Sequence, residues 1–311
     1  MNNKVLDQDV PQLTKIYQNL VENSMTNLTF TNLKYKELID ETSKYTALFG
    51  FLLSCFGIIF NILSFQTAKF LGKYNTAVYF IRTLAIWDTS SIFIDGIVDL
   101  GGRFFGIPVT DYSCKNFYLH QWATGYVANF HLVSLVFDRF LAIKKPIWYR
   151  SGNHMWYAYL LSIISFSIGY GSCIPTLFVF GVLFLLFAFF GFLHLYNSAH
   201  FQLILFFNGY FIKYLKTHSK KSQTSNERTM VIMLATVSFT FLIFTLTCGI
   251  LCLILFQIDT STEMGRSEEN LVLVLLQIPS VMNSSLNFVF FYLSGKGYRV
   301  AFHNLVKSYF K

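Results

Sequence analysis

Charged residues are scarce in this sequence, since Asp, Glu, Lys and Arg make up only 13% of its 311 residues. A soluble domain carries about 25% charged residues. The hydrophobic fraction is 54% and the aromatic fraction 19%, with 36 Phe and 18 Tyr. A soluble globule of this size could not bury so much apolar surface. The composition therefore excludes a disordered chain, a basic nucleic-acid-binding domain and an ordinary cytosolic enzyme.

Motifs of catalysis and phosphate binding are also absent. The sequence has no His-Glu-x-x-His, no Gly-x-Ser-x-Gly and no glycine-rich phosphate loop. His120 and His131 lie eleven residues apart, and we favour a ligand-pocket or core role for them over metal binding. A transporter would show inverted repeats, and no matching half is found. We expect no enzyme and keep a transporter as an alternative.

Continuous apolar runs of about twenty residues favour membrane-spanning helices over the alternating strands of a barrel. Polar segments separate most of these runs. Residues 157–212 are the exception, because they could hold two long helices or three short ones and so give seven or eight spans. The runs lie near 46–70, 76–100, 114–143, 155–176, 177–212, 229–257 and 270–293.

The distribution of Lys and Arg decides between seven and eight spans, because both residues prefer cytoplasmic loops. With seven spans and the N-terminus outside, inner segments hold 15 Lys and Arg and short outer loops hold 3. An eighth span before Lys213 would move a basic cluster and the C-terminal tail outside. We therefore predict an all-α fold, a bundle of seven transmembrane helices.

This topology divides the chain into an extracellular tail at 1–45, a transmembrane domain at 46–294 and a cytoplasmic segment at 295–311. The tail has no signal-peptide pattern, so the first span is expected to act as the insertion signal. Asn27 begins an Asn-x-Thr triplet and is a predicted glycosylation site. Apolar residues recur at helical spacing after position 295, which predicts a short amphipathic helix on the inner membrane surface.

Polar residues interrupt three of the apolar runs. Asn61 lies in the first, Asp88 in the second, and Asn283 and Asn287 in the last. An ionisable side chain at bilayer depth costs about 2.5–3.5 kcal/mol on insertion scales, which makes Asp88 a functional candidate. The alternative is that these groups only hydrogen-bond between helices, at ~0.6 kcal/mol for each contact.

These positions share their order and spacing with one receptor class. In chain order they are Asn61, Leu84-Ala85-x-x-Asp88, Cys114, Asp138-Arg139-Phe140, Asn283–Phe288 and Gly295–Arg299. Cys114 lies 25 residues before Arg139, which is the separation found in this class. Together they resemble the rhodopsin-like G-protein-coupled receptors over residues 46–310. The last stretch is similar to invertebrate neuropeptide receptors, including FMRFamide-receptor-like proteins. The resemblance implies a plasma-membrane receptor that passes the signal of an extracellular ligand to a heterotrimeric G protein.

The resemblance also assigns roles to residues at the inner ends of the spans. Arg139 would pair with Asp138 and face Glu227, while Tyr210 matches the inner Tyr of the family's fifth span. A solvated loop charge is the alternative for Glu227. Deeper in the bundle, the family holds a sodium ion at the position of Asp88, which implies a site formed with Asn61, Asn283 and Asn287. Ala128 replaces a Ser ligand of the family, so we expect weak sodium binding.

The ligand class follows from residues nearer the outer face. The last run contains no Lys, which excludes a retinal Schiff base. Gln121 stands 18 residues before Arg139, where amine receptors carry Asp, and this argues against a biogenic amine. The acids of the expected pocket would suit a peptide with a basic end. An equal alternative is that the pocket candidates only pack between helices. The pocket candidates are Gln121, Asp95, Asp99, Tyr118 and Trp122.

Two departures from the family leave alternatives open. The segment Phe241–Thr247 lacks the family's Trp and Pro, and loss of Pro removes a helix kink. An atypical receptor that does not signal is therefore an alternative. Residues 177–193 are apolar and contain no Cys, so this loop is either drastically shortened or wrong in the gene sequence. Cys114 thus lacks its family partner. Cys173 is the nearest candidate for a disulfide, and an unpaired Cys114 is favoured.

Overall fold

The structure is a computed structural model that describes residues 6–71, 76–107, 111–145, 155–178, 202–210, 225–255 and 257–310, together with a few single positions between them. Among the helical residues, the structure describes the side chains everywhere except in 6–30, 111–118, 174–178 and most of 225–234. Every regular element in the described residues is a helix, which confirms the all-α prediction.

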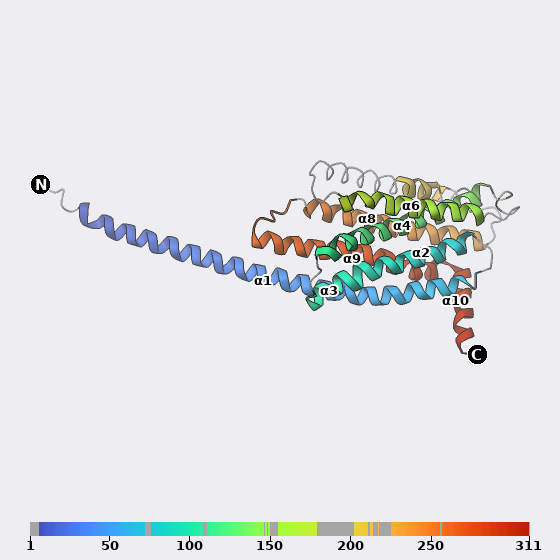
Figure 1. Cartoon of the computed structure of the whole chain (residues 1–311), viewed down its shortest axis with the longest axis horizontal. Coiled ribbons are helices and arrows are strands. Elements are labelled where there is room, and N and C mark those ends of the chain that lie inside the picture. The colour runs from blue at the N-terminus through green and yellow to red at the C-terminus, as the bar shows by residue number, and fades with distance from the viewer. Residues whose placement is uncertain are drawn as a thin grey trace.

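The long helices run side by side as a bundle, and Figure 1 shows α1 continuing far beyond it at the N-terminal end. We call the end where α3 finishes and α9 begins the α3 end, and the opposite end, where α10 lies, the α10 end. In chain order the elements are α1 (Leu6–Ala68), α2 (Thr76–Ile92), the π-helix η1 (Phe93–Leu100), α3 (Gly101–Phe105), α4 (Asp111–Lys144), α6 (Met155–Phe178), α8 (Ser225–Leu255), α9 (Glu263–Ser294) and α10 (Lys296–Tyr309).

Five stretches of the described chain are long and apolar enough to cross a membrane. They are Thr31–Ala68, Thr76–Phe105, Leu119–Lys144, Ala235–Leu255 and Glu263–Ser294. Large apolar side chains also point out of the bundle in rows spaced three and four residues apart. On α8 this row is Phe239, Ile243, Leu246, Ile250 and Leu253, each at least 49% exposed. Such outward rows suit contact with lipid, as expected for a membrane protein.

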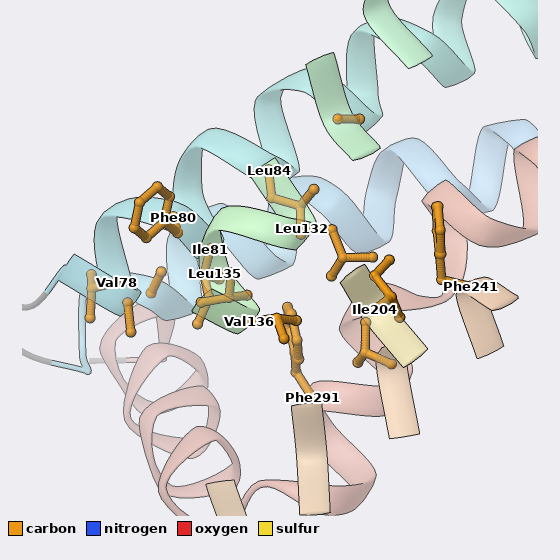
Figure 2. Close-up of a cluster of buried hydrophobic side chains, with 14 of the residues drawn as sticks. Val78, Phe80, Ile81, Leu84, Leu132, Leu135, Val136, Ile204, Phe241 and Phe291 are labelled. Atoms are coloured by element: carbon orange, nitrogen blue, oxygen red, sulfur yellow. The ribbon is translucent and has the colours of Figure 1, made fainter. Parts of the chain in front are cut away.

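One apolar core joins the helices toward the α10 end. Figure 2 shows side chains from α2, α4, α8, α9 and the helical residues 202–210 meeting there. Phe80, Leu135 and Phe291 are among its largest fully buried members. Within a membrane such side chains stabilise the bundle by close van der Waals packing, because lipid tails are as apolar as the core itself. The same core includes Tyr157 of α6.

The first helix passes through residue 45, where the predicted extracellular tail meets the first span. Helix α1 runs without interruption from Leu6 to Ala68, and neither Gly nor Pro occurs between Pro11 and Gly50 to end it. Its polar stretch also touches the rest of the bundle, since Lys36 Nζ lies 2.8 Å from a carboxylate oxygen of Glu263.

The second span is longer than the expected 76–100 because η1 and α3 prolong α2. It ends at Gly106, which adopts a left-handed φ of 69°, the usual conformation of glycine after a helix. The helix predicted after position 295 is confirmed as α10. Tyr298 and Leu305 are buried on its inner face, and the Tyr298 hydroxyl donates to Ser64 Oγ of α1 at 2.9 Å.

Candidate functional site

A line of paired polar side chains joins the second span to α9, and we call it the polar seam. As residue numbers rise along the second span, those of its partners fall along α9, as antiparallel helices require. Asn287 donates to Asp88 at 2.7 Å and Ser280 to Asp95 at 3.2 Å, Gln277 donates to Asp99, and Arg103 donates to Asn270. Spacings of three, four and seven residues keep each set on one helix face.

Asp88, which is 2% exposed, lies at one end of the polar seam. Besides the bond from Asn287, its carboxylate lies beside Ser284. Asn61 of α1 donates to the Ser284 carbonyl at 3.0 Å. The structure thus joins Asp88 to Asn287 directly and to Asn61 through Ser284. Asn283 makes none of these hydrogen bonds within the described chain, and its neighbour Ser284 lies at the site instead.

Oxygen atoms suited to a monovalent cation are present at this point. The side-chain oxygens Asn61 Oδ1 and Ser285 Oγ are buried and have no hydrogen-bond partner among the described residues. Gly57 permits the close approach, because a Cβ on it would lie 2.1 Å from Ser285 Oγ. The residues therefore fit a sodium ion bound chiefly by Asp88. Ala128, 3% exposed, adds no oxygen from α4.

The π-helix carries the next part of the seam. Asp95 and Asp99 lie on it, 5% and 4% exposed, and π-helical turns occur often at functional sites. Arg103 Nε donates to Asp99 at 2.8 Å, so this carboxylate already has a cationic partner. Asp95 instead accepts bonds from the Ser91 and Ser280 hydroxyls.

The other pocket candidates are only partly assembled around these acids. The Gln121 amide approaches the Asp95 carboxylate. Trp122 is 41% exposed, and its ring packs against Tyr126 of its own helix. The side chain of Tyr118 lies outside the described residues. The buried His131 donates from Nδ1 to the Val127 carbonyl at 2.8 Å, which suits the core role.

A second polar cluster lies at the α10 end, around Asp138 and Arg139. These neighbours are 0% and 3% exposed, and Arg139 Nε donates to Asp138 Oδ2 at 2.8 Å. Three hydroxyls from other segments bond the same carboxylate. Thr76 of α2 donates at 2.6 Å, Tyr149 donates at 3.1 Å, and Tyr157 of α6 also donates. We call these five residues the hydroxyl cage.

Tyr149 closes the hydroxyl cage from the segment between α4 and α6. Its hydroxyl oxygen accepts from Arg139 Nη2 at 2.6 Å, and its ring lies under the guanidinium. Burial raises the pKa of the Tyr149 phenol, so its hydroxyl remains a donor at neutral pH. Arg suits this place because it stays charged and presents several donors in one plane.

The remaining coupling candidates lie beside the hydroxyl cage or beyond the described side chains. Tyr210 packs edge to face on Phe140, with ring centroids 4.8 Å apart. The side chain of Glu227 is not among those described, so its pairing with Arg139 stays a prediction. The same holds for the glycosylation of Asn27 and for the Cys114–Cys173 bridge, of which only the buried Cys173 is described.

Comparison with known proteins assigns no family to this geometry, since no protein-family model and no curated protein matches the sequence. The functional argument therefore rests on the residues themselves. Sequence reasoning missed the three hydroxyls of the cage, because Thr and Tyr in apolar surroundings are unremarkable. It also missed Asn270, Gln277 and Ser280, although their spacing with Ser284 and Asn287 marks one polar face of α9.

Proposed function

We propose that this chain is a seven-helix receptor of the rhodopsin-like class, which passes the signal of an extracellular peptide to a heterotrimeric G protein at the plasma membrane. The hydroxyl cage carries the proposal. Burying an ion pair costs several kcal/mol for each ion before the partners attract one another. If Arg139 only anchored the helix at the lipid surface, its charge would have no need to be buried. Burial suits a charge that is held inside the resting protein and exposed on activation.

Seven spans are supported by the two segments that the five apolar stretches leave out. Helix α6 has 24 residues, enough to cross a bilayer, and Tyr157 and Ala158 place it in the common core. Ile204 and Phe207 place the helical residues 202–210 in the same core. The Lys and Arg distribution favours a cytoplasmic location for the α10 end.

Orientation is tested directly by an epitope inserted at Ser222, between the fifth and sixth spans. We expect antibody to reach the tag only after the cells are permeabilised. A matched tag in the segment 1–5 should be reached in intact cells. Labelling of the Ser222 tag in intact cells would contradict the seven-span topology.

The proposed mechanism releases Arg139 from its cage. In the resting state Asp138 and Tyr149 hold the guanidinium away from the cytoplasm. Movement of α8, which carries Glu227, would open this end and let Arg139 bind a helix of the G protein. An active state populated at about 0.1–10% rises up to tenfold for each ~1.4 kcal/mol of bias. Loss of one partner of Arg139 is therefore enough to change basal signalling.

Two substitutions test this mechanism through second-messenger output at matched surface expression. Arg139→Ala should abolish G-protein coupling and leave ligand binding intact, and Glu227→Ala should raise output without ligand. Lys307→Ala, exposed on α10, is the control for loss of one charge at this end. A neuropeptide library supplies the ligand. Full signalling by Arg139→Ala would exclude the mechanism, and unchanged basal output in Glu227→Ala would exclude only the Glu227 contact.

Sodium is proposed to stabilise the resting state at Asp88, with Asn61 and Asn287 beside it. The ion would supply positive charge to a carboxylate that is otherwise bonded only to neutral groups there. Asp88→Asn should remove the sodium dependence of agonist binding. If sodium has no effect on the unmodified receptor, the polar residues serve only to join the helices.

The second candidate is a seven-helix relative that binds a ligand without signalling. Helix α8 favours it, because its 31 residues contain no Pro and so lack the usual cause of a sharp kink. Ligand binding without second-messenger output, in both the parent chain and Glu227→Ala, would support this candidate. A transporter would instead carry labelled substrate across sealed vesicles.

A further inference from the structure

Two adjoining cavities open at the α3 end, between the polar stretch of α1 and the start of α9. The first has a volume of about 380 Å³ and is lined by Lys36, Asp40, Glu263, Arg266, Ser267 and Asn270. The second, of about 320 Å³, shares Asp40 and Asn270 with the first. Its other charged lining residues are Lys44 and Arg103. Each is large enough for a small ligand or part of a peptide, since ligand sites measure about 300–1,000 Å³.

The walls of both cavities carry an excess of positive charge. Four cations line them against two acids. Lys36 is paired with Glu263 at 2.8 Å. Asp40 lies near Lys36 and makes no ion pair within the described chain. Arg103 is paired with Asp99 at 2.8 Å, so Lys44 and Arg266 are the lining cations that make no ion pair within the described chain.

Lys44, Arg266 and the paired Arg103 all keep donors that the described chain does not use. The Lys44 ammonium contacts only the Phe104 ring among the described residues, at 5.9 Å from its centroid. Arg103 uses Nε for Asp99 and Nη1 for Asn270, which leaves Nη2 for the cavity. Arg266 makes no side-chain hydrogen bond to the described chain. Carboxylate and phosphate groups are the partners that such donors bind most strongly.

The site is held in place by the folded structure around it. Asn270 accepts from Arg103 and donates to Ser43 Oγ at 3.0 Å, so it ties α9 to both α3 and α1. Thr262 caps the start of α9 by accepting from the Gly265 amide at 3.0 Å. Phe105, which is 62% exposed, gives the second cavity an apolar wall beside its cations.

We propose that these two cavities form a binding site for a carboxylate that is attached to an apolar group. The proposal rests on the receptor function proposed above. It adds that the ligand carries an anionic group, which binds at the α3 end of the bundle. The free carboxyl end of a peptide with an apolar last residue has this chemistry. This differs from the basic peptide end expected from the sequence, since Arg103 already neutralises Asp99.

The test measures binding of hydrocinnamate to the full chain in phosphatidylcholine nanodiscs, without G protein. Its neutral analogue, hydrocinnamamide, has the same shape and no charge. We expect the carboxylate to bind at least about fivefold more tightly, since an exposed charge contact changes affinity by roughly this factor. The double substitution Lys44→Gln with Arg266→Gln should remove the preference.

The control is Lys34→Gln with Lys296→Gln, which removes the same charge from exposed positions outside both cavities. It should keep the preference for the carboxylate. Equal binding of acid and amide, or a preference that survives in the Lys44 and Arg266 variant, would overturn the proposal. If phosphatidylserine added to the discs competes with hydrocinnamate, the anion that the site binds comes from a lipid headgroup. If it does not compete, the anion belongs to a soluble ligand. Loss of signalling by Arg139→Ala is a separate result, so the receptor mechanism and the anion site can fail independently.

Discussion

The hydroxyl cage makes a sharp prediction about Tyr157. Its hydroxyl donates to Asp138 Oδ1, and the residue is 7% exposed, so water cannot replace the bond. A hydrogen bond to a charged group contributes about 1.5–3 kcal/mol. Thr76 and Tyr149 still bond the carboxylate after Tyr157→Phe, which favours the lower half of that range. We expect the free energy of unfolding to fall by about 1.5–2 kcal/mol.

The control lies two residues further along the same helix. Tyr159 is 51% exposed, and its ring packs on Tyr79 with centroids 5.0 Å apart. Tyr159→Phe removes the same hydroxyl from the same helix without touching Asp138. Substitutions at such surface positions usually change stability by less than about 0.5 kcal/mol. The two variants should therefore differ by 1 kcal/mol or more, on the order given for charged bonds.

The assay is unfolding in mixed micelles by titration with sodium dodecyl sulfate, followed by circular dichroism. Asp138→Asn supplies the second half of a double-mutant cycle. It leaves Arg139 buried without its anion and should cost about 3–5 kcal/mol. In that background Tyr157→Phe should cost much less than in the parent chain, because its acceptor is no longer charged. Equal effects of Tyr157→Phe and Tyr159→Phe would refute the cage as a stabilising unit.

Three further substitutions and one control test the polar seam and the helix contacts by the same assay. Gly57→Ala should destabilise by about 1–3 kcal/mol through overpacking against α9, whereas Gly171→Ala, whose Cβ would meet nothing within 4 Å, should be neutral or stabilising. Asn287→Ala should cost about 1.5–3 kcal/mol through its bond to Asp88, and a loss below 0.5 kcal/mol would contradict that bond's role. Tyr298→Phe should cost about 0.6–1.5 kcal/mol and loosen α10, which limited proteolysis of the tail detects.

The sequence predicted the helical architecture well because apolar run length and charge placement both follow from the bilayer. Runs of apolar residues give the spans, and their limits agree with α2, α4 and α9 to within several residues. The sequence did not predict that α1 continues through the residues before position 45, because a polar composition indicates contact with water and does not by itself indicate a helix. A polar sequence without Gly or Pro can still continue a helix that has already formed, because each added residue closes one more hydrogen bond.

The candidate site was predictable where a charge stood alone in an apolar run. Asp88 was found this way, since an isolated ionisable group in such surroundings is costly. Asp138 was found beside Arg139 at the end of a run, through the resemblance of this pair to the receptor motif. The partners of these carboxylates were harder to find. Tyr149 and Thr76 reach Asp138 from different segments, and only the packing of α2 against α4 brings them together. The motif pointed to Asn283, whereas the structure places its neighbour Ser284 beside Asp88. Neighbouring residues point about 100° apart on a helix, and the order of a motif does not show which of them faces the site.

The distribution of polar contacts also indicates which helix is free to move. The polar seam ties the second span to α9 at four levels, and Asn61 adds α1 to the same unit. A shift of one helical turn would break all four pairs at once. From Ala235 onward, α8 makes a single interhelical hydrogen bond within the described chain, a thiol contact from Cys248 to the Leu276 carbonyl at 3.7 Å. Apolar contacts can slide at lower cost than paired buried groups can separate. Motion that opens the α10 end beside the hydroxyl cage is therefore expected in α8, while the seam keeps α1, the second span and α9 as a rigid support.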